Sequence, residues 1–232
     1  MRFPITTALC LGTVSVLVLT ACSNGSARAT NPTSSGSASG RPEGKNAPAA
    51  GPLSSAALAK RLLDEGDLGE GYTRKAEQPG RHDDVTVIGC PGLGELGGDA
   101  TAGGGLDFPR RAKVSFTYAG GTGSEVSEEL YSGTAAELSS GVSRIFEAMT
   151  SCPSYQVLIG STAVTVTNQN VSVPRLGDER WSQLLTFTVD GHSHVVKQTA
   201  VRVGMVVAVV SGSAALVDAH VVKAVAKARV TT

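Results

Sequence analysis

The sequence predicts an α+β fold: an antiparallel sheet with helices packed on one of its faces, in a single domain. Two observations support this fold class. Segments rich in β-branched residues recur from residue 85 onward, and Asp190-Gly191 joins two of them with the spacing of a two-residue β-hairpin. The helical patterns precede, interrupt or follow runs of strands, so they cannot all be crossover helices of a parallel sheet.

The expected strands are short segments of alternating or continuous apolar residues bounded by turn-forming residues. They are residues 85–88, 113–118, 125–131, 155–159, 163–167, 181–189, 195–203 and 205–210. The last of these is apolar on both faces, which predicts a central position in the sheet.

Three helices are expected, each with recognisable end signals. The first covers Leu53–Leu63 and has Gly66 just beyond its end. The second begins at the capping box Thr134-Ala-Ala-Glu137, carries apolar residues at helical spacing on one face, and ends at Cys152-Pro153. The third covers Ala214–Val230, with basic residues near its C-terminal end, where the helix dipole is negative.

The N-terminus has the layout of a secretory signal peptide. Arg2 supplies a positive charge, and Ile5–Leu19 is a largely apolar run of about 15 residues, short of the roughly 20 that a membrane-spanning helix needs. Leu19-Thr20-Ala21-Cys22 resembles the lipobox of bacterial lipoproteins. The resemblance implies that residues 1–21 are removed and that the Cys22 thiol receives a diacylglycerol. The alternative is an ordinary signal peptide with an incidental cysteine.

Residues 22–52 are expected to form a lipidated, disordered tether. From Ser23 to Pro52 the chain consists mainly of Ser, Gly, Ala, Pro, Thr and Asn, so it cannot bury enough surface to offset its chain entropy. A flexible coil of about 30 residues spans roughly 30 Å on average. Because two acyl chains hold a protein on a membrane without a spanning helix, residues 53–232 are expected to form an extracytoplasmic domain anchored to the cell membrane by its N-terminal lipid.

The charge balance argues against one class of partner. The chain has 20 basic and 20 acidic residues, and removal of residues 1–21 takes away only Arg2, so the mature chain is nearly neutral. A broad nucleic-acid footprint needs a pronounced basic excess, so nucleic acid is not an expected partner. The abundance of Gly, Ala, Val and Arg is typical of a high-GC actinobacterial genome.

Cys90 and Cys152 remain in the mature domain and are predicted to form a disulfide. An exported protein lies in an oxidising compartment, which favours this pairing. The bridge would close a loop of about 62 residues, worth roughly 4 kcal/mol in the chain-entropy model, and would fix the end of the Thr134 helix to the strand that ends at Cys90. A metal site is the alternative, but neither Cys has a second Cys or a His within a few residues.

A set of small-residue and turn motifs is spread over most of residues 53–230. They are a helix beginning at Leu53, the turn Gly71-Tyr72, the two cysteines, the turn Leu176-Gly177-Asp178-Glu179, a long hairpin, the segment Val201-Arg202-Val203-Gly204 and a closing helix. Together they resemble the extracellular sensor domain of mycobacterial PknH-type kinases and its lipoprotein relatives. The resemblance implies a secreted α+β domain with a cleft for an unidentified ligand, and it carries over no catalytic residues.

The chain also departs from that family. The family has a second disulfide, which is missing here because no Cys follows Cys152, and this leaves the corresponding part of the cleft undefined. The length and the absence of kinase motifs exclude a kinase.

Gly92-Leu-Gly94-Glu-Leu-Gly97 matches the dinucleotide-binding pattern G-x-G-x-x-G but is expected to be a glycine-rich loop. The residues that follow, among them Gly98 and residues 103–105, cannot begin the helix whose N-terminus would hold a pyrophosphate, and no βαβ unit surrounds them. No cofactor is therefore expected.

His192 and His194 follow the hairpin turn and are a possible pair of metal ligands. A two-residue hairpin sets Val189 opposite His192 and Phe187 opposite His194, so both imidazoles lie on one face. The other candidates for a third ligand are His82, His220 or a distant carboxylate. No local spacing indicates any of these, so solvent-exposed turn histidines are the favoured interpretation and no metal is expected.

Arg110, Arg111 and Lys113 cluster after Pro109, with Arg81 in an earlier loop. Such a group can hold a phosphate or carboxylate through bidentate hydrogen bonds, so these three are the candidate ligand-binding residues. The alternative is an exposed strand edge, where charges deter edge-to-edge association.

The local patterns of common hydrolases are absent: there is no G-x-S-x-G, no S-x-x-K followed by K-T-G, and no H-E-x-x-H. No catalytic residue is assigned. The predicted function is that of a cell-surface lipoprotein with a non-catalytic ligand-binding or sensor-like domain, whose partner beyond the membrane is a small molecule or an envelope protein. Two other classes stay open: an envelope hydrolase with a non-local constellation around His192, His194 or His220, and a structural lipoprotein that binds another envelope protein through an exposed apolar patch.

Overall fold

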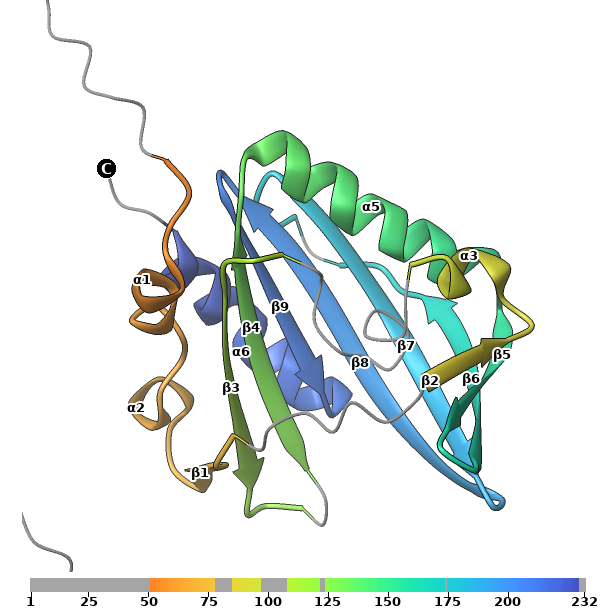
Figure 1. Cartoon of the computed structure of the whole chain (residues 1–232). Coiled ribbons are helices and arrows are strands. Elements are labelled where there is room, and N and C mark those ends of the chain that lie inside the picture. Colours follow the sequence, from red (N-terminus) through yellow and green to blue (C-terminus); the bar gives the residue numbers. More distant parts are fainter. Residues whose placement is uncertain (1–50, 78–84, 97–107, 122–123, 174, 230–232) are drawn as a thin grey trace, which may run out of the picture. The chain divides into compact units, whose positions relative to one another are not determined.

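A computed structural model describes residues 51–77, 85–96, 108–121, 124–173 and 175–229 (Figure 1). The helices of this part of the chain are α1 (Ser55–Ala59), α2 (Glu65–Leu68), α3 (Pro91–Gly94), α5 (Ala135–Ser151) and α6 (Ala214–Ala228). The strands are β1 (Tyr72–Arg74), β2 (Val85–Ile88), β3 (Arg111–Tyr118), β4 (Glu125–Ser132), β5 (Ser154–Ile159), β6 (Thr162–Asn170), β7 (Glu179–Val189), β8 (His192–Val203) and β9 (Val206–Gly212). The expected signal peptide, Cys22 and the tether lie outside the described residues.

The described strands form one nine-stranded sheet in the order β1-β3-β4-β9-β8-β7-β6-β5-β2. Every neighbouring pair is antiparallel, as predicted. Helix α5 carries the chain from β4, in one half of the sheet, to β5, in the other half (Figure 1). The expected central position of the last strand is confirmed, because β9 lies between β4 and β8.

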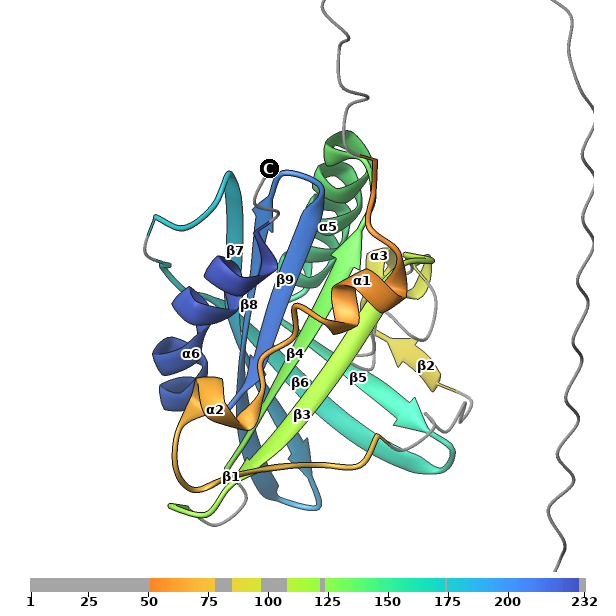
Figure 2. The same ribbon diagram turned by 90° about the vertical axis from the view of Figure 1, so that its left-hand side faces the viewer.

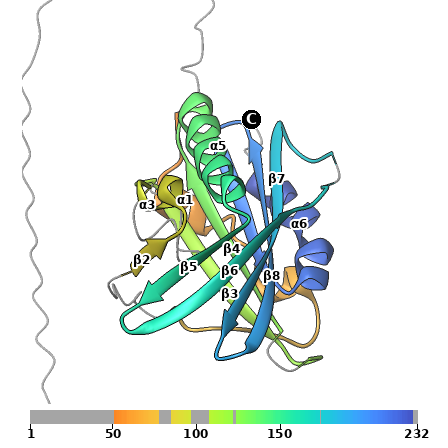
Figure 3. The same ribbon diagram turned by 90° about the vertical axis from the view of Figure 1, so that its right-hand side faces the viewer.

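Helices cover both faces of the sheet, so the prediction of helices on one face was wrong. Figure 2 looks onto the side of α1, α2 and α6, and Figure 3 shows α5 on the opposite side. The physical reason lies in β9: Ala208 and Val210 pack in the core with α6, whereas Val207 and Val209 pack in the core with α5. A strand that is apolar on both faces needs cover on both, and a single helical layer would leave one set of valines in water.

The first predicted helix is shorter than expected and a second one follows it. Helix α1 ends at Ala59, and the chain restarts a helix after Asp64, whose side chain accepts a hydrogen bond from the backbone N–H of Asp67. Asp67 reaches back to the Asp64 backbone, which completes a capping box. The N3 residue of this box is Asp67, where the common pattern has Glu or Gln, so α2 was not predicted from the sequence. The predicted capping box of α5, between Thr134 and Glu137, is present.

The Asp190-Gly191 hairpin is confirmed in its turn and its register. Both turn residues have positive φ, 49° at Asp190 and 77° at Gly191, as a two-residue turn between twisted strands requires. Val189 faces His192 and Phe187 faces His194, as expected. Strand β2 has the predicted bounds, and β1 was not predicted. The other strands are longer than predicted by one to four residues, because pairing continues into polar segments such as Asn168–Asn170 of β6.

The Cys90–Cys152 disulfide is also confirmed, with Cα atoms 5.7 Å apart. Cys152 is the C-cap of α5, and Cys90 lies between the end of β2 and the start of α3. Cys90 is buried, at 1% exposure. The bridge therefore joins the edge strand β2 to the end of the helix that crosses the sheet.

Two of the motifs that carry the family resemblance form one structural unit. Arg202 of β8 donates from Nη1 to Asp178 Oδ2 (3.1 Å) and from Nη2 to Glu179 Oε1 (2.7 Å). The Gly204 backbone N–H donates to the same Asp178 oxygen at 2.7 Å. Gly177 has φ of +63°, and a Cβ there would lie 2.4 Å from the Arg202 carbonyl oxygen. Only glycine allows the turn before β7 to approach β8 this closely.

Candidate functional site

A groove of about 460 Å³ lies beside α5, at the start of β7. One wall is a single face of α5, formed by Ser143, Phe146, Glu147 and Thr150, which are three or four residues apart. The other walls are Asn170, which ends β6, residues 171–173, which follow it, and residues 180–182 of β7. The volume is within the usual range for small-molecule sites. Figure 3 shows these elements side by side.

Trp181 is the main aromatic group of the groove and the only tryptophan in the chain. It is partly exposed and packs against the core cluster under α5. The ring centroids of Trp181 and Phe146 are 6.1 Å apart, with the planes inclined by 31°. The groove therefore has a large aromatic ring, partly open to solvent, in its lining.

Polar groups surround this aromatic surface. Hydroxyl and amide side chains line the groove at Ser143, Thr150 and Asn170, and the groove also has one acidic residue, Glu147, and one basic residue, Arg180. Neither Glu147 nor Arg180 forms an ion pair with another described residue. The groove can therefore both donate and accept hydrogen bonds, and it also has an apolar surface.

A row of amides, of which Gln183 is buried and the other two are partly buried, ties the strands together close to the groove. Gln183, with no exposed surface, accepts a hydrogen bond from Asn168 Nδ2 and donates from Nε2 to Gln198 Oε1, each at 2.9 Å. The three residues come from β6, β7 and β8. The row fixes β7 in place two residues after Trp181, which limits how far the ring can move.

The predicted cationic group is only partly brought together. Arg111 and Lys113 of β3 line a second groove, of about 770 Å³, together with Arg74 and Lys75, which the sequence analysis did not single out. Arg110 is not among its lining residues. Lys113 Nζ pairs with Glu129 at 2.5 Å, so part of the positive charge is already neutralised.

This second groove runs along the edge of β3, because β1 pairs only with residues 116–118 of that strand. Ligand binding by Arg110, Arg111 and Lys113 stays a prediction, and the strand-edge alternative agrees with the position of the last two. Arg81 lies outside the described residues.

The histidines do not form a common site within the described residues. His192 and His194 are exposed at the hairpin, and no group of three His, Cys, Asp or Glu residues in the described part of the chain could hold a metal ion. His220 of α6 is buried, and its Nε2 lies 2.6 Å from Tyr72 Oη. Burial, followed by the charge of Lys223, lowers the pKa of His220. His82 lies outside the described residues.

The glycine-rich motif begins as a helix rather than a loop. Pro91–Gly94 forms the single turn α3, with Cys90 as its N-cap and Leu93 buried. The remaining glycines of the motif, from Gly97, lie outside the described residues. No side chain or backbone arrangement seen here supports a dinucleotide site at α3.

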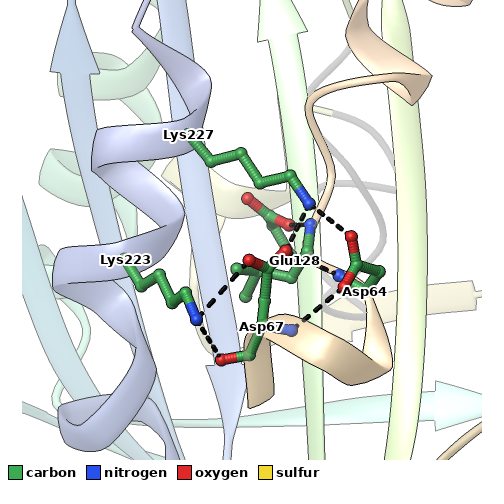
Figure 4. Close-up of polar contacts among 6 residues, drawn as sticks. Asp64, Asp67, Glu128, Lys223 and Lys227 are labelled. Atoms are coloured by element: carbon green, nitrogen blue, oxygen red, sulfur yellow. Dashed lines mark hydrogen bonds and ion pairs between the residues drawn. The ribbon is translucent and has the colours of Figure 1, made fainter. Parts of the chain in front are cut away.

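An ionic cluster, which the sequence did not reveal, joins α2, α6 and β4 (Figure 4). Asp64 and Lys223 are exposed, whereas Asp67 and Lys227 are partly buried. Lys227 Nζ bonds to Asp64 Oδ2 at 2.7 Å and also to Asp67 Oδ2, and Lys223 Nζ bonds to the Asp67 carbonyl oxygen at 2.6 Å. Beside them lies Glu128, which is 1% exposed. The cluster links α2 to the C-terminal helix α6 on one face of the sheet (Figure 2).

Glu128 is the chemically unusual member of this cluster. Its Oε2 accepts a hydrogen bond of 2.6 Å from the Leu63 backbone N–H, whereas its Oε1 is buried without a hydrogen-bond partner. Burial raises the pKa of Glu128 to about 7, against the lowering effects of the Leu63 hydrogen bond and the Lys227 charge. The one signal in the sequence is its position, two residues from Val126 and from Leu130, on the core side of β4.

Comparison with known proteins gives one informative likeness. No protein-family model matches the chain, and no curated protein matches it. Among solved structures, the crystal structure of the extracellular domain of PknH from Mycobacterium tuberculosis matches with a TM-score of 0.54 and 14% sequence identity. The match covers 76% of this chain and 95% of that one.

The chain shares its fold with that domain. At this level of identity the likeness concerns the fold alone, and it confirms the fold that the resemblance implied. The likeness does not test the lipobox. No helix within the described residues is both long enough and apolar enough to cross a membrane.

Proposed function

We propose that this chain is a lipid-anchored, extracytoplasmic, non-catalytic binding domain of the sensor type, and that its ligand enters the groove beside Trp181. The observation that carries the proposal is the partly exposed single tryptophan in a groove of about 460 Å³ that also presents hydroxyl, amide and charged groups.

The proposed location rests on three features. Leu19-Thr20-Ala21-Cys22 follows an apolar run that is too short to span a membrane. The Cys90–Cys152 disulfide is typical of an oxidising compartment. The fold is shared with a domain described as extracellular. Export of a chain that receives its lipid at Cys22 agrees with all three features.

Binding is better supported than catalysis in this groove. Among the described residues, its lining has no His, the most common general base. His220, which the hydrolase alternative would use, contacts Tyr72 in the core between α6 and the sheet instead. The hydroxyls of Ser143 and Thr150 are therefore better placed to hydrogen-bond a ligand than to attack it.

Mass spectrometry of the chain purified from membranes tests both parts of the proposal. We expect a diacylglycerol mass on Cys22, its loss in Cys22→Ser, and a small molecule that copurifies with the native chain. Trp181→Ala should lose that molecule, whereas Phe187→Ala, a change of another partly buried aromatic residue outside the groove lining, should keep it. Equal retention by the two variants would place the ligand elsewhere, and an unmodified Cys22 would refute the anchor.

A further inference from the structure

The chemistry of the groove narrows the class of ligand. The apolar part of the lining consists of two neighbouring aromatic rings, Trp181 and Phe146, together with Val171 and Val173. A flat, rigid, partly exposed ring suits a ligand that itself has a flat apolar face. A flexible acyl chain would instead need an apolar lining along its length, and here Ser143, Thr150 and Asn170 interrupt the walls.

The charges of the groove favour a ligand without net charge. Glu147 and Arg180 both line it, and neither is paired with another described residue. An anion would be attracted by the Arg180 guanidinium but repelled by the Glu147 carboxylate, and for a cation the two effects are reversed. In either case the repulsion offsets the attraction. A neutral ligand can use both groups as hydrogen-bond partners, an acceptor and a donor.

Ligand edges that both donate and accept hydrogen bonds fit the remaining side chains. The Asn170 amide has a donor and an acceptor, and the Ser143 hydroxyl can act as either. The Thr150 hydroxyl donates to the Glu147 backbone carbonyl oxygen at 3.1 Å and can accept a hydrogen bond from a ligand. These groups come from α5 and from the last residue of β6, and Trp181 of β7 lines the same groove. A ring with apolar faces and hydroxyl groups around its edge satisfies the aromatic and the polar contacts at once.

We infer that the groove binds a neutral saccharide, with one sugar ring against Trp181 and its hydroxyl groups bonded to Asn170 and Glu147. This inference rests on the proposed function, because it names the ligand class of the same groove. An anionic ligand would be expected in the groove along β3, where Arg74, Lys75, Arg111 and Lys113 line one cavity, rather than beside Trp181.

The single tryptophan makes a direct binding assay possible. The full chain, kept in a detergent without a sugar headgroup, is titrated with maltotriose, mannotriose and chitotriose while Trp181 emission is recorded. We expect a saturable change with at least one of these trisaccharides at up to millimolar concentration. Asn170→Ala should weaken the affinity about tenfold, the effect of losing one hydrogen bond.

Gln169→Ala is the matched control, because this exposed amide is adjacent in β6 but does not line the groove. Its affinity should equal that of the native chain. Calorimetry with Trp181→Ala, which has no tryptophan signal, should show no binding. Equal affinity of Asn170→Ala and Gln169→Ala would overturn the inference, since the sugar would then bind elsewhere.

Two further probes separate this inference from the proposed function. Decanoate and inorganic phosphate are titrated in the same way. If either saturates a change in Trp181 emission while no trisaccharide does, the saccharide inference fails and the groove remains a binding site. If no trisaccharide changes the emission and Trp181→Ala still retains the copurifying molecule, both proposals fail.

Discussion

Replacement of Glu128 by Gln should change how the stability of the domain depends on pH. The carboxyl group is buried, with Oε1 unpaired, and its pKa is about 7 in the folded protein against 4.5 for an unperturbed glutamic acid. A raised pKa stabilises the fold only while the group is neutral, so this contribution is complete below pH 4.5 and is lost as the pH rises to 7.

The size of the effect follows from the two pKa values. Each unit of pKa corresponds to 1.36 kcal/mol, so ionisation of Glu128 costs about 3 kcal/mol of unfolding free energy once the pH is above 7. Gln retains a carbonyl oxygen that can accept from the Leu63 N–H but does not ionise. Between pH 5 and pH 8 the variant should therefore gain about 2–3 kcal/mol of stability relative to the native chain.

Urea unfolding at pH 5, 6, 7 and 8 at constant ionic strength measures this difference. The lowered pKa of His220 makes the fold less stable as the pH falls, which is the opposite of the Glu128 effect. Because the native chain and Glu128→Gln share this effect, it cancels in the comparison. Glu125→Gln, at an exposed position of the same strand, is the control and should run parallel to the native chain. Parallel curves for Glu128→Gln and the native chain would refute the burial argument.

Three further predictions concern stability, each measured by urea unfolding against the native chain. Removal of the disulfide by the double change Cys90→Ser and Cys152→Ser should cost up to about 4 kcal/mol, and native chain treated with reductant should show the same loss. Gly177→Ala should cost about 1–3 kcal/mol, because a Cβ at positive φ meets a carbonyl oxygen, whereas Gly94→Ala, with open space around it, should be nearly neutral. Arg202→Lys should cost about 1–2 kcal/mol, because an ammonium group cannot hold Asp178 and Glu179 together as the guanidinium fork does; a loss no larger than that of the exposed Arg180→Lys would contradict this role.

Features that depend on neighbouring residues were predictable from the sequence. The capping box at Thr134 fixed the start of α5, and Asp190-Gly191 fixed both the turn and the register of β7 against β8. The pairing of Cys90 with Cys152 was also predictable, because residues 53–232 contain no other cysteine. The capping box and the turn depend on residues that are close in the sequence, and the cysteine pair has no alternative pairing within the domain.

The groove could not be predicted, because its parts come from separate regions of the chain. Phe146 and Glu147 lie on α5, whereas Asn170 and Trp181 lie at the ends of two different strands. In the sequence, Trp181 is predicted only as the first residue of a strand. How much of its ring is exposed to solvent depends on how far α5 covers this part of the sheet. Glu128 is a similar case, since its burial depends on α2 and α6, which flank it from the two ends of the chain.

The sequence by itself determined the signals that act over a few residues: the strand and helix patterns, the hairpin, the caps and the cysteine pair. The tertiary structure alone decided which face of the sheet each helix covers, which carboxyl group is buried, and where an aromatic ring remains open to a ligand. The physical reason is that burial depends on the sum of contacts from distant segments, and no pattern of neighbouring residues contains that sum.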